Sequence, residues 1–162
     1  MKYFQLDGII DDSTLARFME FCNNNTFEEW TIVINSVGGS SVLATMILSI
    51  INSNSEKTTL ISAGCYSAAF YIFYFAKCKR KMIYGSIGMH HRESIRGLTI
   101  NEKGNPKYQE DLCYLENLKA VRDNFLKRVM TKKEKELYNS DDDVYFTFKR
   151  MREIFPNVEI VR

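Results

Sequence analysis

Hydrophobic residues in the first half of the chain form short strand-like runs that alternate with longer helical ones. Residues 30–34 show no polar alternation after Thr31, a pattern typical of a parallel strand covered on both faces. Residues 42–51 and 68–76 are apolar almost all the way around a helix, which predicts that both helices are buried. The alternation predicts parallel α/β units. The expected strands are 3–6, 30–34, 58–62 and 82–84, and the expected helices are 14–22, 42–51 and 68–76.

The second half of the chain is more polar, and its pattern is less regular. Residues 92–105 are polar with scattered glycines and β-branched residues, which predicts an excursion or hairpin. Residues 106–129 carry an apolar stripe at helical spacing and predict one long helix. Thr131 and Glu134 form a capping-box pattern that opens a short helix. The remaining expected elements are a strand after the acidic turn 141–143, a helical turn capped by Thr147 and a strand at 158–161.

Length, charge and cysteine content limit the class of protein. The 162 residues fit one domain and contain no repeats or linkers, so we expect a single domain with an excursion at about 92–130. A net charge of +2 is too small to indicate a nucleic-acid or membrane partner. The N-terminus lacks a signal-peptide pattern, and the cysteines lack paired spacing, which predicts a cytoplasmic protein with free thiols. The cysteines are Cys22, Cys65, Cys78 and Cys113.

Two segments at strand-to-helix junctions carry candidate chemistry. Gly38 and Gly39 follow a strand and precede a helix, so they form either a simple tight turn or a loop whose N–H groups face an oxyanion. Ser67 also follows a strand and opens a helix. It is therefore either an ordinary helix cap or a nucleophile at a sharp turn.

The only two histidines in the chain, His90 and His91, are adjacent. Successive side chains of an extended segment face opposite ways, so only one of them can reach the serine. Two histidines with opposite orientations do not form a zinc site, so we expect no metal. Residues 141–143 are three aspartates, which form either a solvated turn or the source of an orienting carboxylate. The sequence leaves open which of Asp141, Asp142 and Asp143 would serve.

Together these segments resemble the proteolytic subunit of the Clp protease, in the Clp/crotonase superfamily, over nearly the whole chain. Residues 34–40 (INSVGGS) look like that family's INSPGG oxyanion loop, with a valine in place of the proline. Residues 63–69 (AGCYSAA) look like its GQAASMG nucleophile segment, and residues 87–91 (IGMHH) look like its IMIHQ segment. Residues 139–147 are similar to the segment that carries its triad acid.

The resemblance implies a serine peptidase with a catalytic triad. Ser67 would be the nucleophile, His90 the general base and Asp143 the orienting acid. The backbone N–H groups of Gly39 and Ala68 would bind the oxyanion. The substrate would be a peptide or unfolded protein, and neither a metal nor a cofactor is implied.

The resemblance also implies a fold and an assembly. The expected fold is an α/β ββα superhelix of the Clp/crotonase kind, a single domain with a handle-like excursion at about 92–130. The expected assembly is a homo-oligomeric ring, a heptamer or stacked heptamers, without nucleic acid or membrane partners. The chain begins at the first strand, so we expect the family's axial loop to be missing, which disfavours an AAA+ ATPase partner. A Phe155–Pro156 step replaces a glycine turn of the family.

Three other interpretations remain open from the sequence. Residues 85–88 (GSIG) also look like signal-peptide-peptidase relatives, which use a Ser–Lys dyad, and Lys103, Lys107 or Lys119 could then be the base. A crotonase-like protein would instead bind an acyl-CoA at the glycine loop. A catalytically inactive ring subunit is the third interpretation, and retention of the serine, the histidine and the acid argues against it.

Overall fold

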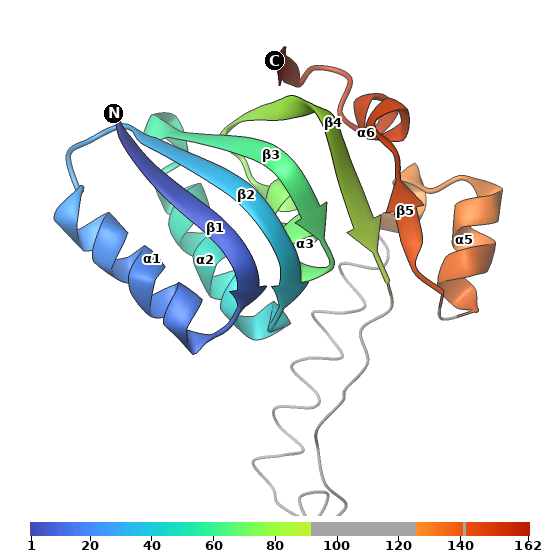
Figure 1. The fold of residues 1–162 in the computed structure, drawn as a ribbon, viewed down its shortest axis with the longest axis horizontal. Helices are drawn as coiled ribbons and strands as arrows, with labels where there is room; N and C mark the ends of the chain where they lie inside the picture. Colours follow the sequence, from blue (N-terminus) through green and yellow to red (C-terminus); the bar gives the residue numbers. More distant parts are fainter. Residues whose placement is uncertain (92–125, 141) are drawn as a thin grey trace, which may run out of the picture. The chain divides into compact units, whose positions relative to one another are not determined.

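The computed structural model of the protein describes residues 1–91, 126–140 and 142–162 (Figure 1). The chain divides into two compact units, Met1–His90 with Tyr145–Arg162 and His91–Val144. Strands and helices alternate along the first unit, so the α/β prediction is confirmed. Its elements are β1 (Lys2–Ile10), α1 (Asp12–Asn24), β2 (Trp30–Gly39), α2 (Ser41–Ser53), β3 (Thr58–Tyr66), α3 (Ala68–Phe75), β4 (Lys79–His90), α6 (Phe148–Ile154) and β6 (Glu159–Val161), with β5 (Val144–Phe146) starting at the boundary of the two units.

Six strands of the described residues form one sheet in the order β1-β2-β3-β4-β5, with β6 also paired to β4. The pairs β1–β2, β2–β3 and β3–β4 are parallel, as the sequence predicted, and β6 also pairs with β4 in parallel. Because parallel strands point the same way, the carboxyl ends of β2, β3 and β4 lie at one edge of the sheet, where candidate residues at strand ends can meet.

Helices α1, α2 and α3 pack side by side against one face of this sheet (Figure 1). The strand residues beneath them are apolar and have no exposed surface, and burial of each such side chain stabilises the fold by about 1.5–3 kcal/mol. The caps are local: Asp11 accepts a hydrogen bond from the Thr14 N–H at 2.9 Å, and Ser40 accepts one from the Leu43 N–H at 3.3 Å. The fully buried strand residues include Leu6, Ile32, Ile34, Leu60 and Met82.

The opposite face of the sheet is less covered than the sequence predicted. Tyr3, Gln5 and Lys79 on this face are exposed, and Val33 is only half-buried. The prediction that residues 30–34 are covered on both faces is therefore wrong at Val33. The prediction of a wholly buried second helix is wrong too, since α2 packs only through one side and leaves Met46 45% exposed. The third helix is confirmed as buried, with six of its eight residues buried.

The central strands are longer than predicted, and this extension carries the candidate site. β2 and β3 continue past the expected ends through shifts in pairing register at Ile34/Asn35 and Ser62/Gly64. β4 runs on from the predicted 82–84 segment to His90. Polar and glycine residues occupy the positions where the register shifts. The hydrophobic pattern is interrupted there, so the sequence did not predict that the strands continue.

Several local predictions for the rest of the chain are confirmed. Thr131 and Glu134 form the expected capping box at the start of α5 (Lys132–Asn139). Thr147 caps α6 through the Arg150 N–H at 3.3 Å. The excursion at 92–105 and most of the helix expected at 106–129 lie outside the described residues, although 126–129 are helical. No helix of the described ranges is long and apolar enough to span a membrane.

Candidate active site

Ser67 occupies a strained turn between β3 and α3. Its φ of 53° makes it the only non-glycine residue with positive φ in the described part of the chain. Such a conformation costs of the order of 1–3 kcal/mol in an L-residue, and it persists where the surrounding structure fixes it, often at active sites. Ser67 precedes the first residue of α3, but its side chain makes no capping hydrogen bond. The interpretation of this serine as an ordinary helix cap therefore does not hold.

Backbone hydrogen bonds hold the turn on both sides. The Ser67 N–H donates to the Met89 carbonyl of β4 at 2.8 Å, and the Tyr71 N–H donates to the Ser67 carbonyl at 3.2 Å. Ala68 and Ala69 follow with almost no exposed surface, so small side chains allow α3 to start close to the sheet. The serine is thus fixed by its own strand, the next strand and the helix.

The strand register places His90 beside Ser67. Tyr66, the last residue of β3, pairs with Met89 of β4, so Ser67 and His90 are the residues that directly follow this pair. His90 is 6% exposed, and its ring lies 6.3 Å from the Phe70 ring of α3, measured between centroids. An imidazole held between a sheet and a helix next to a strained serine fits the role of a general base.

The glycine loop closes against the same turn. A Cβ atom on Gly38 would lie 2.6 Å from the Tyr66 carbonyl oxygen and 2.8 Å from the Ser67 Cβ, so only glycine allows this approach. The Gly38 N–H donates to the Ser36 hydroxyl at 3.1 Å, so this N–H is already used inside the loop and is not an oxyanion donor. The expected oxyanion donors remain the amide of Gly39 and that of Ala68, which lies in the first turn of α3 and so has no intrahelical acceptor.

Replacing Gly38 with alanine should destabilise the protein by about 1–3 kcal/mol more than replacing Gly85, because the new Cβ would press on the Ser67 turn. Gly85 is a matched control, with a φ of 87° against 90° for Gly38 and no atom within 4 Å of the position that a Cβ would take there. Urea unfolding of both variants measures the difference. Equal losses would mean that backbone strain, and not packing against Ser67, decides the cost.

The acidic segment lies in the other unit. Asp142 accepts a hydrogen bond from the Ser140 hydroxyl at 2.8 Å, and Asp143 directly precedes β5, as the sequence predicted. Asp141 lies outside the described residues. Because Asp143 belongs to His91–Val144 and His90 to the first unit, the approach of the acid to the histidine stays a prediction. The lysines of the alternative dyad, Lys103, Lys107 and Lys119, are also outside the described residues.

A buried pair of serine hydroxyls between β3 and β4 was not predicted from the sequence. The Ser62 and Ser86 hydroxyls lie 2.7 Å apart, and the Cys65 sulfur is 3.0 Å from the Ser62 hydroxyl. The pair joins β3 to β4 where β4 has extra residues, since Ser62 pairs with Met82 but Gly64 pairs with Ile87. The hydrogen bond between these hydroxyls therefore ties β4 to β3 before the strand reaches His90. Burial raises the pKa of the Cys65 thiol to about 12, so this cysteine is not a competing nucleophile.

Neither a protein-family model nor a curated protein sequence matches this chain. The fold and the site themselves define the class. The protein is an α/β protein in which the carboxyl ends of three parallel strands bring together a glycine loop, a strained serine and a buried histidine.

Proposed function

We propose that the protein is a serine peptidase of the Clp proteolytic-subunit type. The observation that carries the proposal is the strained Ser67, whose amide is bonded to the strand that presents His90 in the neighbouring position. An ordinary cap serine has no need of a strained backbone, whereas a nucleophile must project from a sharp turn. The glycine loop packed against this turn further supports acyl-transfer chemistry.

In the proposed reaction, the Ser67 hydroxyl oxygen attacks a peptide carbonyl carbon. His90 takes the hydroxyl proton and returns it to the leaving amine, after which water, activated by the same imidazole, releases the acyl group. Asp143 orients the imidazole in this scheme. The N–H groups of Gly39 and Ala68 bind the negatively charged oxygen of the tetrahedral intermediate. The proposal requires no metal and no cofactor.

We extend the proposal to the Clp/crotonase superhelix. The register shifts in β2 and β3 divide each strand into two segments, as expected where two strands of a repeating unit are joined through a bend. The expected handle at about 92–130 lies mostly outside the described residues and remains part of the proposal.

Labelling with a fluorophosphonate, which reacts with activated serines, tests the proposal directly. The intact protein should be labelled once, and peptide mapping should place the label on Ser67. Heat-unfolded protein is the control, because its serines are not activated and it should remain unlabelled. Absence of labelling, or labelling at another serine, would contradict the proposed nucleophile.

Single Asn substitutions at Asp141, Asp142 and Asp143 should leave only the Asp143 variant inactive. Asparagine keeps the size of the side chain but cannot stabilise the imidazolium, and the corresponding change in a triad costs about 10⁴-fold in kcat. Steady-state hydrolysis of a fluorogenic peptide measures each variant, and each unaffected variant is a control for the others. A large loss at Asp141 or Asp142 instead would show that the assigned acid is wrong by one or two residues.

We also propose a homo-oligomeric ring, a heptamer or stacked heptamers. The first unit leaves large side chains exposed on its surface, including Tyr3 at 69% and Tyr84 at 70%, and tyrosines are enriched at protein interfaces. Light scattering coupled to size exclusion should give several times the chain mass of 18.9 kDa. A peak at the chain mass that cleaves peptides would eliminate the ring while leaving the peptidase chemistry in place.

A further inference from the structure

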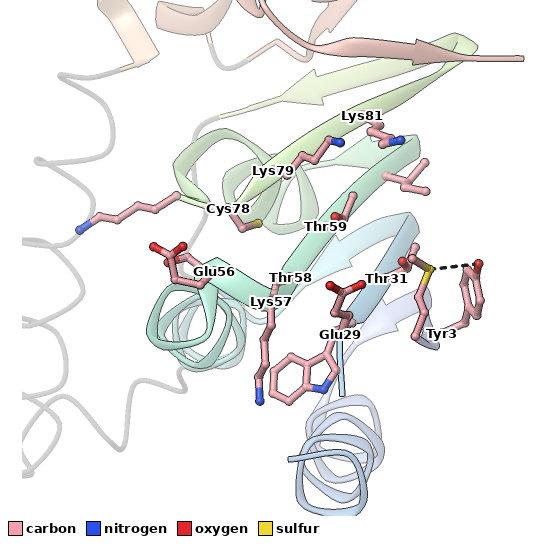
Figure 2. Close-up of a pocket in the computed structure, with 15 residues that line it drawn as sticks. Tyr3, Glu29, Thr31, Glu56, Lys57, Thr58, Thr59, Cys78, Lys79 and Lys81 are labelled. Carbon is pink, nitrogen blue, oxygen red and sulfur yellow. Dashed lines mark hydrogen bonds between the residues drawn. The ribbon is translucent and has the colours of Figure 1, made fainter. Parts of the chain in front are cut away.

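A hollow of about 630 Å³ lies at the amino ends of the sheet strands (Figure 2). Its lining comes from the starts of β1 to β4 and from the 3₁₀ turn Ser55–Lys57, so it is at the opposite edge of the sheet from Ser67. The peptidase proposal makes no use of it. Its volume is within the range of small-molecule sites.

Strand register arranges the floor of the hollow into a row of polar side chains. Tyr3 pairs with Thr31, Thr31 with Thr59, and Thr59 with Lys79, so one residue from each of four neighbouring strands stands in line. Neighbouring strands are about 4.8 Å apart, which sets the spacing of the row. Lys81 stands two residues after Lys79 and therefore on the same face. Figure 2 shows the two threonines and the two lysines on adjacent strands.

Lys79 and Lys81 already share an internal carboxylate. The Lys81 ammonium lies 2.8 Å from one oxygen of Glu159, and the Lys79 ammonium lies 3.6 Å from the other. The hydrogen bond from Lys81 is the main reason that the pKa of Glu159 is lowered. The side chain of Lys79 is 62% exposed and that of Lys81 is 23% exposed, so a ligand can reach Lys79 fully and Lys81 in part. The spacing of the two ammonium groups therefore suits one oxyanion.

Two of the other charged residues in the lining limit the kind of ligand. Lys57 is engaged elsewhere, since its ammonium donates to the Thr26 carbonyl and lies 4.2 Å over the Trp30 ring. Glu29 directly precedes β2, two strands away from the lysines of β4, and would repel a second negative charge there. Its carboxylate would instead accept hydrogen bonds from hydroxyl groups. The lining therefore favours a ligand with a negative charge beside the β4 lysines and hydroxyl groups beside Glu29.

We propose that this hollow is a binding site for a phosphorylated polyhydroxy compound of the sugar-phosphate class. The phosphate would be bound by the ammonium groups of Lys79 and Lys81 and by the hydroxyl of Thr59, the strand partner of Lys79. A phosphate ester carries about −1.5 to −2 charges at pH 7, so it competes with Glu159 better than a carboxylate does. The hydroxyl groups would donate to Glu29.

Calorimetric titration of the full chain with glucose 6-phosphate tests the site, with glucose and inorganic phosphate as comparison probes. Glucose 6-phosphate should bind at least tenfold more tightly than either. The double variant Lys79→Gln with Lys81→Gln should weaken its binding at least tenfold. The matched control Lys132→Gln with Lys133→Gln changes the net charge equally on the exposed surface of α5 and should leave binding unchanged.

Two further variants test whether the ligand is bound by specific groups of the hollow or only by the positive charge of its lysines. Thr59→Val removes a donor at constant charge and should weaken binding severalfold, while Glu159→Gln should tighten it, because the lysines lose their internal carboxylate. Melting curves confirm that each variant is folded. The proposal is overturned if glucose 6-phosphate does not bind, if both lysine pairs weaken it equally, or if inorganic phosphate or glucose binds as tightly. None of these measurements depends on peptidase activity.

Discussion

Replacing Ser67 with alanine should lower hydrolysis of a fluorogenic peptide by at least about a thousandfold, which is the scale of loss when a catalytic triad loses its nucleophile. The variant should remain folded, because the substitution removes one hydroxyl and keeps the Cβ atom that already occupies the strained turn. Steady-state rates, with circular dichroism and melting curves alongside, measure both parts of the expectation.

Ser53→Ala is the matched control for this change. Ser53 is an exposed serine at the end of α2, so the same atom is lost far from the strained turn. Its hydrolysis rate should equal that of the unchanged protein. If Ser67→Ala hydrolyses the peptide at the unchanged rate, the protein is not a serine peptidase at this site.

Helix starts could be predicted from the sequence because they depend on neighbouring residues. Thr131 and Thr147 each accept a hydrogen bond from an N–H group three residues further on, as the sequence predicted. This chemistry is contained in four consecutive residues, so it is visible without knowledge of the fold. For the same reason the sequence also predicted the second hydrogen bond of the capping box, which the Thr131 N–H donates to the Glu134 carboxylate.

Strand lengths depended on distant partners and were therefore underestimated. Ser36 is a polar residue where the hydrophobic run of β2 has ended, but its hydroxyl donates to the Gly8 carbonyl at 2.7 Å. Gly8 is 28 residues away from Ser36, so the sequence around Ser36 gives no sign of this hydrogen bond. The same holds for Ser62 and Ser86, whose hydroxyls satisfy each other inside the core.

The candidate site was predictable in its residue types and not in its geometry. The positions of Ser67 and His90 at strand ends were visible in the sequence, but a helix cap and a nucleophile have the same local pattern. The positive φ of Ser67 and the pairing of Tyr66 with Met89 distinguish them, and both are properties of the folded sheet. The hollow at the opposite edge was missed because its rows exist only once the strands are in register.

The two histidines should differ sharply when each is replaced by alanine. His90→Ala should reduce peptide hydrolysis nearly as much as Ser67→Ala does, because His90 is buried beside the serine turn and no other imidazole is available there. His91→Ala should be much milder, since the next side chain of an extended segment points the other way. The same fluorogenic assay measures both.

Because His90 is buried against Phe70, its truncation could also disturb packing, so His90→Gln serves as a second variant that fills more of the space. Glutamine cannot act as a general base, so this variant should be inactive while melting near the unchanged temperature. Activity retained in both His90 variants would contradict the triad. If Lys103→Ala or Lys107→Ala then abolished hydrolysis while Ser67 remained essential, the base would be a lysine. The same serine would in that case work in a Ser–Lys dyad.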